Sequence, residues 1–313
     1  MDCDTTPGGS LMSNGEVWPN FYIVGAARSG TTSLYDALRK HPQVFLPEVK
    51  EPHYFTYCPG LESIPSVSAH QYVCCGNREM YQKLYCHGAG FAAIGDVSPS
   101  YLWDKCAPRK IREVALGAKI IAILRDPVDR AHSQYLLNHL NGVDQAPSFA
   151  IALQEDAARD KSSWMTARLY IEAGLYHAQV LRYLEAFGED QVLILSFNDL
   201  THRRGDLLSA LCRFIGVDPG SLSPLQDPEA QNASKMARFP TAYKIATRLG
   251  LRKGILPESV RNWLGRSPWL FDKNKPPLDG HSRKLLQDIY EPDLVMLEKL
   301  LGRSYPELRQ SWN

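Results

Sequence analysis

The stretch NFYIVGAARSGTTS at residues 20–33 decides how this chain folds. Four consecutive apolar residues at 21–24 lead into Gly25, and a second glycine, Gly30, stands five positions later. A buried strand, a G-x-x-x-x-G loop and a helical pattern, in that order, are typical of a turn that binds phosphate through backbone N–H groups. Nucleotide triphosphatases carry a lysine directly after the second glycine, where this chain has Thr31. The sequence therefore predicts a phosphate-binding loop that is poorly equipped for γ-phosphoryl transfer.

The side chains of this loop can add to the backbone site. Arg28 is a guanidinium that can bind phosphate or sulfate oxygens in a fork, and the hydroxyl groups that follow it can donate hydrogen bonds. Such a site needs no metal. The residues expected to contact the anion are Arg28, Ser29, Gly30, Thr31, Thr32 and Ser33.

Short apolar runs alternate with helical patterns along the rest of the chain. The runs that read as buried parallel strands are Phe21–Val24, Val44–Leu46, Ala92–Ile94, Ile120–Leu124 and Val192–Leu195. The helical patterns cover residues 31–40, 127–139, 174–187, 204–215 and 280–301. This alternation predicts an α/β fold: a P-loop-containing, doubly wound parallel sheet flanked by helices, with a helical C-terminal cap. We expect residues 1–17 to be disordered and residues 18–313 to form one domain.

The composition is that of an ordinary soluble globular protein. Of 313 residues, 44% are hydrophobic and 22% charged, and the formal net charge is +1, so no global field favours nucleic acid or an anionic membrane. No apolar run approaches the roughly 20 residues of a membrane span. Because residues 1–17 lack the pattern of a signal peptide, we expect a cytoplasmic protein. The alternative is the lumenal catalytic domain of a trimmed Golgi-type enzyme.

The seven cysteines are odd in number and irregularly spaced, with no C-x-x-C motif. A zinc site is therefore not expected, although Cys74, Cys75, Cys86 and His87 cluster in the sequence. Reduced thiols are the preferred interpretation, and one disulfide within residues 58–106 is the alternative.

A second motif lies at residues 119–135, KIIAILRDPVDRAHSQY. A buried strand delivers Arg125 at its carboxyl end, and a helix starts directly afterwards with Ser133 about two turns into it. An arginine and a hydroxyl at the edge that also carries the glycine loop are suited to a second, separate phosphate. The alternative is that Arg125 pairs with Asp126 or Asp129 and serves only the fold.

Together the two motifs resemble the PAPS-dependent sulfotransferases, most closely the branch of carbohydrate and heparan-sulfate-type enzymes and their bacterial relatives. GAARSGTTSLYDAL resembles their 5′-phosphosulfate loop and ILRDPVDRAHSQY their 3′-phosphate motif, and GDVSPSYL at 95–102 is a supporting similarity. The resemblance runs from about residue 20 to the C-terminus. It implies PAPS as donor, PAP as product, no metal, and a 3′-phosphate bound by Arg125 and Ser133. PAPS has no γ-phosphate, which explains the missing lysine.

A third element, PEVKEPHYF at 47–55, supplies candidate bases. A sulfotransferase needs a group that takes the proton from an acceptor hydroxyl or amine. The resemblance assigns that role to Glu51, with His53 as its competitor and Lys50 as a group that orients Glu51 or neutralises the bridging oxygen. The alternatives are a solvated charged turn for Lys50 and Glu51, and a structural histidine for His53.

Two further residues match the family pattern, and two positions depart from it. Lys235 and Arg238 resemble the late segment that closes over the nucleotide, and are expected to contact the 3′-phosphate. Arg28 stands where the family often has a lysine, so it is expected to act electrostatically, since arginine does not readily donate a proton. Val97 stands where glycan enzymes often carry a lysine, which weakens the transfer of glycan specificity.

The sequence thus predicts a sulfotransferase that moves the sulfuryl group of PAPS onto a hydroxyl or amine of a glycan or small-molecule acceptor, as a monomer or homodimer. One alternative is a P-loop small-molecule kinase that uses ATP-Mg and recruits Lys50. Another is a nucleotide-gated binding protein without catalysis.

Overall fold

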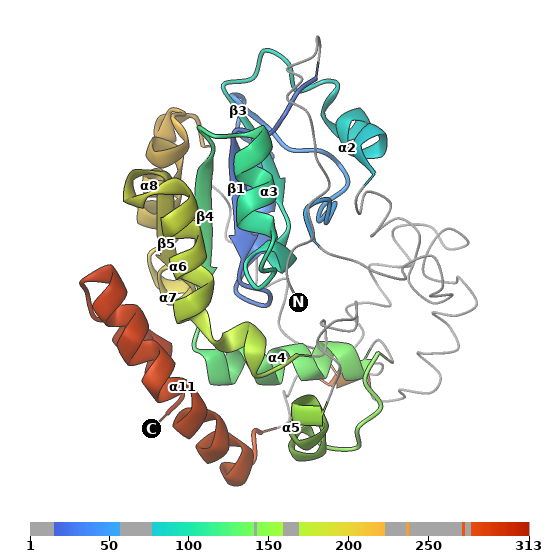
Figure 1. Cartoon of the computed structure of the whole chain (residues 1–313), viewed down its shortest axis with the longest axis vertical. Helices are drawn as coiled ribbons and strands as arrows, with labels where there is room; N and C mark the ends of the chain where they lie inside the picture. The colour runs from blue at the N-terminus through green and yellow to red at the C-terminus, as the bar shows by residue number, and fades with distance from the viewer. Residues whose placement is uncertain are drawn as a thin grey trace.

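A five-stranded, fully parallel sheet forms the centre of the computed structural model (Figure 1). The structure describes residues 16–56, 77–140, 143–158, 169–222, 236–237, 271–272 and 277–312. The strands lie in the order β2-β3-β1-β4-β5, with bounds β1 Phe21–Gly25, β2 Val44–Phe45, β3 Ala93–Val97, β4 Lys119–Leu124 and β5 Val192–Ser196. All five strand predictions are confirmed. A separate antiparallel pair joins β6 Met236–Ala237 to β7 Phe271–Asp272.

Helices connect and cover the strands. They are α1 Thr31–Leu38, α2 Arg78–Tyr85, α3 Ala107–Val114, α4 Pro127–Leu140, α5 Phe149–Ala158, α6 Tyr176–Phe187, α7 Phe197–His202, α8 Arg204–Ile215 and α11 Gly280–Leu301. The five predicted helical patterns correspond to α1, α4, α6, α8 and α11. The sequence did not predict α2, α3, α5 and α7.

The sheet is buried on both faces, as a doubly wound fold requires. Along β1, Phe21 and Ile23 pack in one apolar cluster with residues of α1 and α8, whereas Tyr22 and Val24 pack in another with residues of α3 and α6. All four side chains are fully buried. Because successive side chains of a strand point to opposite faces, a strand covered on both sides is apolar throughout, and this is why the run showed no alternation.

A helical layer lies past the carboxyl ends of the central strands. In Figure 1, β1 points toward α4, and α5 and α11 lie beside α4. Tyr135 of α4, Phe149 of α5 and Tyr290 of α11 belong to one apolar cluster. Farther along α11, Leu294 and Leu297 join the cluster on the α6 face of the sheet. The predicted helical C-terminal cap is therefore confirmed.

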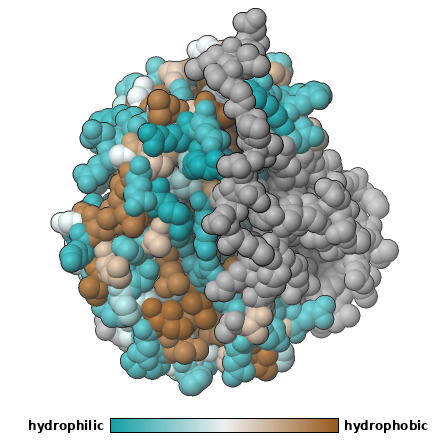
Figure 2. Space-filling model, in the orientation of Figure 1, coloured by the Kyte–Doolittle hydropathy of each residue, from teal (hydrophilic) through white to brown (hydrophobic). Residues whose placement is uncertain are grey.

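The surface mixes polar and apolar residues. Figure 2 shows hydrophilic and hydrophobic residues interleaved over the described part of one face. Within the described ranges, no helix combines the length and the apolar character that a bilayer crossing needs. Of the segment expected to be disordered, Glu16 and Val17 are described, and they bind Arg78 and Gln82 of α2.

The cysteines differ from the preferred interpretation at one position. Cys106 is disulfide-bonded, so the expectation of reduced thiols is wrong there and the alternative of a disulfide within residues 58–106 gains support. Cys86 is an exposed free thiol and Cys212 a buried one. Sequence spacing could not show this because pairing depends on which Cα atoms the fold brings within about 7 Å of each other.

The close packing of β3 against β1 can be tested by its effect on stability. A Cβ atom at Gly95 would lie 2.1 Å from Cζ of Phe21, its register partner on β1. We expect Gly95→Ala to lower the free energy of unfolding by about 1–3 kcal/mol, because the ring has no room to move. Urea denaturation measures the change. The matched control is Gly205→Ala in α8, where a Cβ meets nothing within 4 Å. Equal stability of the two variants would contradict the packing.

Candidate functional site

The loop after β1 depends on its two glycines. A Cβ on Gly25 would lie 2.5 Å from Cβ of Leu102, and one on Gly30 would lie 2.5 Å from Cδ2 of Leu200. Gly30 also has a φ of 92°, in the left-handed region that glycine adopts at no steric cost. The loop can therefore follow this path only with glycine at both positions, which explains the G-x-x-x-x-G spacing.

Gly30 is also the N-cap of α1, and no side chain caps the helix there. The first N–H groups of a helix need partners, and an anion can supply them. Ser29 is fully buried, and its hydroxyl has no hydrogen-bond partner among the described residues. Thr31 is buried as well. An uncapped helix end beside an unsatisfied buried hydroxyl fits a bound phosphate or sulfate group.

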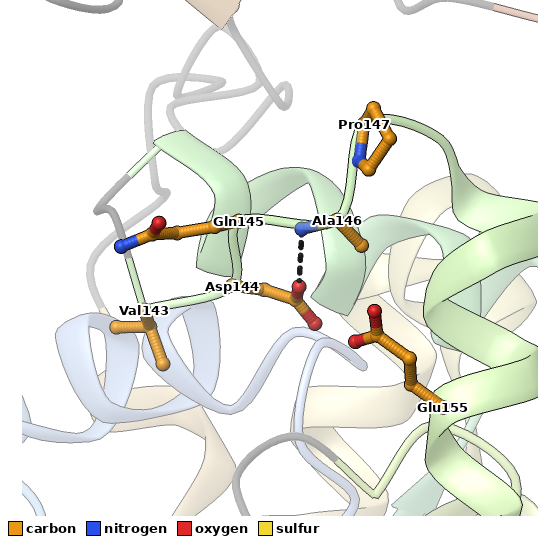
Figure 3. Close-up of a pocket in the computed structure, with 6 residues that line it drawn as sticks. All are labelled: Val143, Asp144, Gln145, Ala146, Pro147 and Glu155. Atoms are coloured by element: carbon orange, nitrogen blue, oxygen red, sulfur yellow. Dashed lines mark hydrogen bonds between the residues drawn. The ribbon is translucent and has the colours of Figure 1, made fainter.

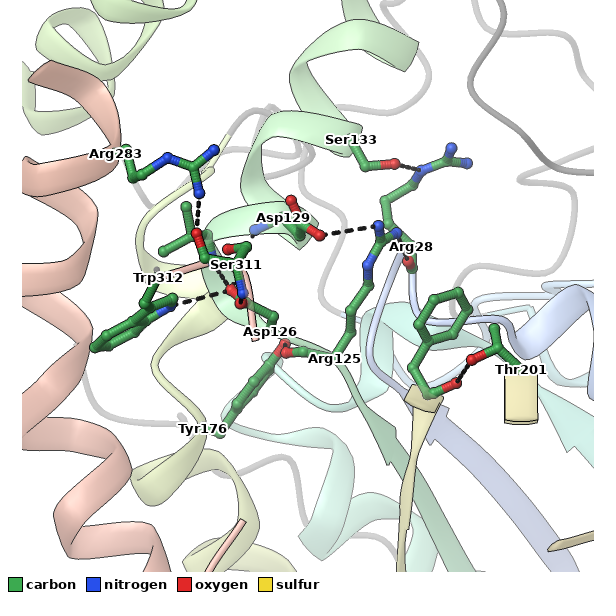
Figure 4. Close-up of polar contacts among 12 residues, drawn as sticks. Arg28, Arg125, Asp126, Asp129, Ser133, Tyr176, Thr201, Arg283, Ser311 and Trp312 are labelled. Atoms are coloured by element: carbon green, nitrogen blue, oxygen red, sulfur yellow. Dashed lines mark hydrogen bonds and ion pairs between the residues drawn. The ribbon is translucent and has the colours of Figure 1, made fainter. Parts of the chain in front are cut away.

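The glycine loop and the second motif meet directly (Figure 4). Arg28 Nε donates to Ser133 Oγ at 3.1 Å, and Arg125 Nη1 donates to the Arg28 carbonyl oxygen at 3.1 Å. Residues expected on two separate anion sites are thus neighbours. The motifs are about a hundred residues apart in sequence, but both follow the carboxyl ends of adjacent parallel strands. Ligands of open α/β sheets bind at this edge.

Arg125 is held from several sides. Its guanidinium carbon lies 4.7 Å from the centre of the Phe197 ring, and Nη2 lies 3.7 Å from Oδ2 of Asp129. The Tyr176 hydroxyl donates to its carbonyl oxygen at 2.9 Å. The alternative interpretation is therefore correct for the Asp129 pair. That contact is longer than a hydrogen bond, so it orients the guanidinium without using its N–H groups fully.

Asp126 does not pair with Arg125 but binds the C-terminal residues instead. Its carboxylate accepts from the backbone N of Ser311 at 2.8 Å, from Trp312 Nε1 at 3.3 Å and from the backbone N of Val128 at 2.9 Å (Figure 4). The Arg283 side chain of α11 donates to the Ser311 carbonyl. The end of the chain therefore braces the turn that carries Arg125.

Two guanidinium groups share this edge, and their proximity affects their ionisation. Burial and the charge of Arg125 lower the pKa of Arg28 to about 10. Arg28 therefore remains a cation at neutral pH, and a nearby anion would relieve its repulsion with Arg125.

The segment after β2 brings the candidate bases to the same edge. Tyr35 of α1 donates to the Pro47 carbonyl oxygen at 2.6 Å and so fixes where the segment turns. Three non-glycine residues of the site are left-handed: Arg28 at φ 67°, Glu51 at φ 61° and His53 at φ 53°. Such conformations cost about 1–3 kcal/mol each and cluster at functional sites. The backbone at Glu51 and His53 is therefore constrained, and the side chains of Lys50 and Glu51 are 17% and 32% exposed.

Glu51 lies beside Lys50 and His53. Lys50 Nζ donates to Oε1, and His53 Nε2 lies 3.7 Å from Oε2. Burial works to raise the pKa of Glu51, but the charge and hydrogen bond of Lys50 and the charge of Arg28 outweigh it, and the pKa lies below its ordinary value. Glu51 is therefore ionised at neutral pH, as a base must be. His53 is almost fully buried, and this burial lowers its pKa to about 4, so it is neutral.

A buried acid behind the site was not among the predicted site residues. Asp96 of β3 is fully buried and accepts from Ser98 Oγ at 2.7 Å and from the hydroxyls of Tyr81 and Tyr101 at 2.8 Å each. Burial raises its pKa to about 6 despite these three donors. The sequence signal for this group was an aspartate within a short buried strand. A carboxylate in such a place needs several hydrogen-bond donors, which makes it notable.

This acid should make the stability of the protein depend on pH. The folded-state pKa of Asp96 is about 6 against an ordinary 3.8, so the folded state binds this proton more tightly. The resulting stabilisation is fully present below about pH 4 and is lost as pH rises through about 6. Between pH 5 and pH 7.5, wild type should lose about 1 kcal/mol of unfolding free energy relative to Asp96→Asn.

Urea denaturation at the two pH values measures this difference. Asp36→Asn, at an exposed position of α1, is the control and should follow wild type. If Asp96→Asn also follows wild type, the pKa of Asp96 is not raised.

Other predicted features lie elsewhere. Lys235 and Arg238 lie outside the described residues. A separate cavity of about 280 Å³ lies between α4 and α5, and none of the predicted site residues lines it (Figure 3). The described residues hold no group of three or more His, Cys, Asp or Glu placed to bind a metal ion.

Comparisons with known proteins identify the family and agree with the fold. The profile of the family described as "Sulfotransferase domain" matches residues 19–294. Human carbohydrate sulfotransferase 15 is 25% identical over 91% of this chain and 53% of its own length. Human bifunctional heparan sulfate N-deacetylase/N-sulfotransferase 3 is 26% identical over 91% of this chain and 30% of its own length. The chain therefore spans about half of the first relative and less than a third of the second.

Among solved structures, a sulfotransferase from Alicyclobacillus acidocaldarius superposes with a TM-score of 0.68 at 25% identity. The match covers 94% of this chain and 99% of that one.

Proposed function

Because the chain belongs to the sulfotransferase domain family, we propose that it transfers the sulfuryl group of PAPS to a hydroxyl or amine of a carbohydrate acceptor, with Glu51 as general base. One observation carries the proposal: the glycine loop, Arg125 with Ser133, and an ionised Glu51 all lie at one edge of the sheet. This is what a donor with two anionic ends and an acceptor that must lose a proton require.

The residues of the site suit the two ends of PAPS. The α1 N-terminus, the Ser29 hydroxyl and Arg28 would hold the 5′-phosphosulfate, and Arg125 and Ser133 the 3′-phosphate. The donor supplies an activated sulfuryl group when it is bound. The protein's part is to place fixed cations where negative charge develops, because preorganised charges stabilise a transition state without reorganisation.

Glu51 is the better candidate base on electrostatic grounds. Its carboxylate is ionised and already oriented by Lys50 and His53, whereas His53 is nearly inaccessible. The charge of Arg28 acts on Glu51, which links the base to the donor loop. A carbohydrate acceptor is supported by the relatives, whose names specify carbohydrate and heparan sulfate substrates.

Donor identity can be tested by binding. We expect isothermal titration calorimetry to show PAP bound more tightly than ATP-Mg. Arg125→Ala should weaken PAP binding about 10-fold to 100-fold, the value of one or two charge-assisted hydrogen bonds. The same variant should weaken the binding of adenosine 5′-phosphosulfate, which lacks the 3′-phosphate, much less, since only the hydrogen bond to the Arg28 carbonyl is then lost. Arg109→Ala, at an exposed pair on α3, is the control. Tighter ATP-Mg binding would point to the kinase instead.

The base can be identified by paired substitutions. Glu51→Gln should reduce kcat for transfer from labelled PAPS about 10²-fold to 10⁴-fold, because the proton then has no acceptor, while PAP affinity stays within about threefold. Glu48→Gln, at a side chain that is 90% exposed, is the control. The acid limb of the pH profile cannot separate Glu51 from His53, since both pKa values lie in the acid range. If His53→Gln abolishes transfer and Glu51→Gln does not, His53 is the base.

A further inference from the structure

The turn that follows β3 contacts His53 through two serine hydroxyls. Ser98 Oγ donates to Asp96 and accepts from the His53 backbone N at 3.4 Å. Ser100 Oγ lies 2.6 Å from His53 Nδ1. The similarity of residues 95–102 to the sulfotransferase pattern did not assign a role to either serine. Together they hold both the backbone and the ring of the residue beside the proposed base.

Thr56 extends this contact into a chain of hydroxyl groups. Its Oγ1 lies 2.7 Å from Ser100 Oγ, and its backbone N donates to the His53 carbonyl oxygen at 3.1 Å. His53, Ser100 and Thr56 are all at least nine-tenths buried. Buried polar groups are held in fixed hydrogen-bonded arrangements, because breaking a bond there leaves an unsatisfied group.

The direction of the hydrogen bonds follows from Glu51. An ionised carboxylate can only accept, and Oε2 of Glu51 faces His53 Nε2 at 3.7 Å. A neutral imidazole carries its proton on one nitrogen. A proton on Nε2 of His53 is attracted to the Glu51 carboxylate, whereas a lone pair on Nε2 is repelled by it. With the proton on Nε2, Nδ1 must accept, and Ser100 must donate to it. The oxygen of Ser100 is then the acceptor for the Thr56 hydroxyl.

We propose that Ser100 and Thr56 are positioning residues that hold His53 in its Nε2–H tautomer, so that the ring donates toward Glu51 and keeps this carboxylate oriented for proton transfer. In this arrangement Lys50 is hydrogen-bonded to one oxygen of Glu51, and the Nε2–H dipole of His53 faces the other oxygen at 3.7 Å, a contact longer than a hydrogen bond. Each carboxylate oxygen accepts two hydrogen bonds, so room remains for the acceptor. The catalytic part of this inference rests on the proposed function, whereas the tautomer does not.

The other charged groups near the pair are accounted for. Lys50 and Arg28 are the cations that act on Glu51, and Asp96 is the acid of β3 behind the Ser98 turn. Burial lowers the pKa of His53 most strongly. The charge of Lys50 lowers this pKa as well, and the charge of Glu51 raises it by less than burial lowers it. The hydroxyl chain thus acts on a neutral ring, where the tautomer is the property it can set.

The tautomer can be read directly from the ¹⁵N chemical shifts of His53, assigned with His53→Gln. Wild type should show a protonated Nε2 and an unprotonated Nδ1. Ser100→Ala and Thr56→Val should each shift the population toward the Nδ1–H form, more strongly for Ser100→Ala. The conservative variants Ser100→Thr and Thr56→Ser keep a hydroxyl and should restore the wild-type pattern. Ser304→Ala, at an exposed position, is the control.

Kinetics supply the second readout. Ser100→Ala should lower kcat about tenfold, leave PAP affinity within about twofold, and move the acid limb of kcat/KM to higher pH, because the carboxylate loses the favourable Nε2–H dipole of His53. The proposal would be overturned if His53 of the wild type were protonated on Nδ1. It would also be overturned if the wild-type tautomer population were unchanged in Ser100→Ala and Thr56→Val. If wild type transfers no sulfuryl group to any acceptor, the proposed function fails, and the tautomer measurement still decides this inference.

Discussion

The hydrogen bond from Arg125 to the Arg28 carbonyl joins the ends of two adjacent parallel strands, and the site depends on it. One strand ends in the glycine loop, the other in the turn before α4. Because both strands are buried on both faces, their ends are fixed, and side chains about a hundred residues apart meet to within 3.1 Å. The C-terminal residues reinforce the same turn through Asp126. Remote parts of the chain thus stabilise one small edge of the sheet.

Electrostatics divides this edge into two functional parts. Arg28 and Arg125 form a cationic part beside an uncapped helix end, which suits an anionic donor. Glu51 is a carboxylate stabilised by neighbouring cations, which suits a base. Three left-handed residues, Arg28, Glu51 and His53, lie where the two parts meet. The surrounding packing and hydrogen bonds, such as that from Tyr35 to Pro47, hold the backbone in these unfavourable conformations.

Much of the fold could be predicted because it rests on local patterns. Apolar runs identified the strands, and helical spacing identified α1, α4, α6, α8 and α11. Glu51, Arg28 and Arg125 could be selected because they follow strands whose carboxyl ends share an edge. Asp96, Ser100 and Thr56 could not be assigned roles in this way, since a buried hydroxyl or acid has meaning only through its partners. The Cys106 disulfide was missed for the same reason.

The sequence by itself determined the fold class, the glycine loop after the first strand and the helix that follows it. These inferences rest on local properties that the chain has before it folds: the glycine spacing, the continuous apolar runs, and Thr31 where nucleotide triphosphatases carry a lysine. Only the tertiary structure decided that Arg28 contacts Ser133, that Asp126 binds the C-terminal residues, and that hydroxyl groups orient His53. These are relations between distant segments. Burial and neighbouring charges set the ionisation of these side chains and the direction of their hydrogen bonds, and both exist only once the chain is packed.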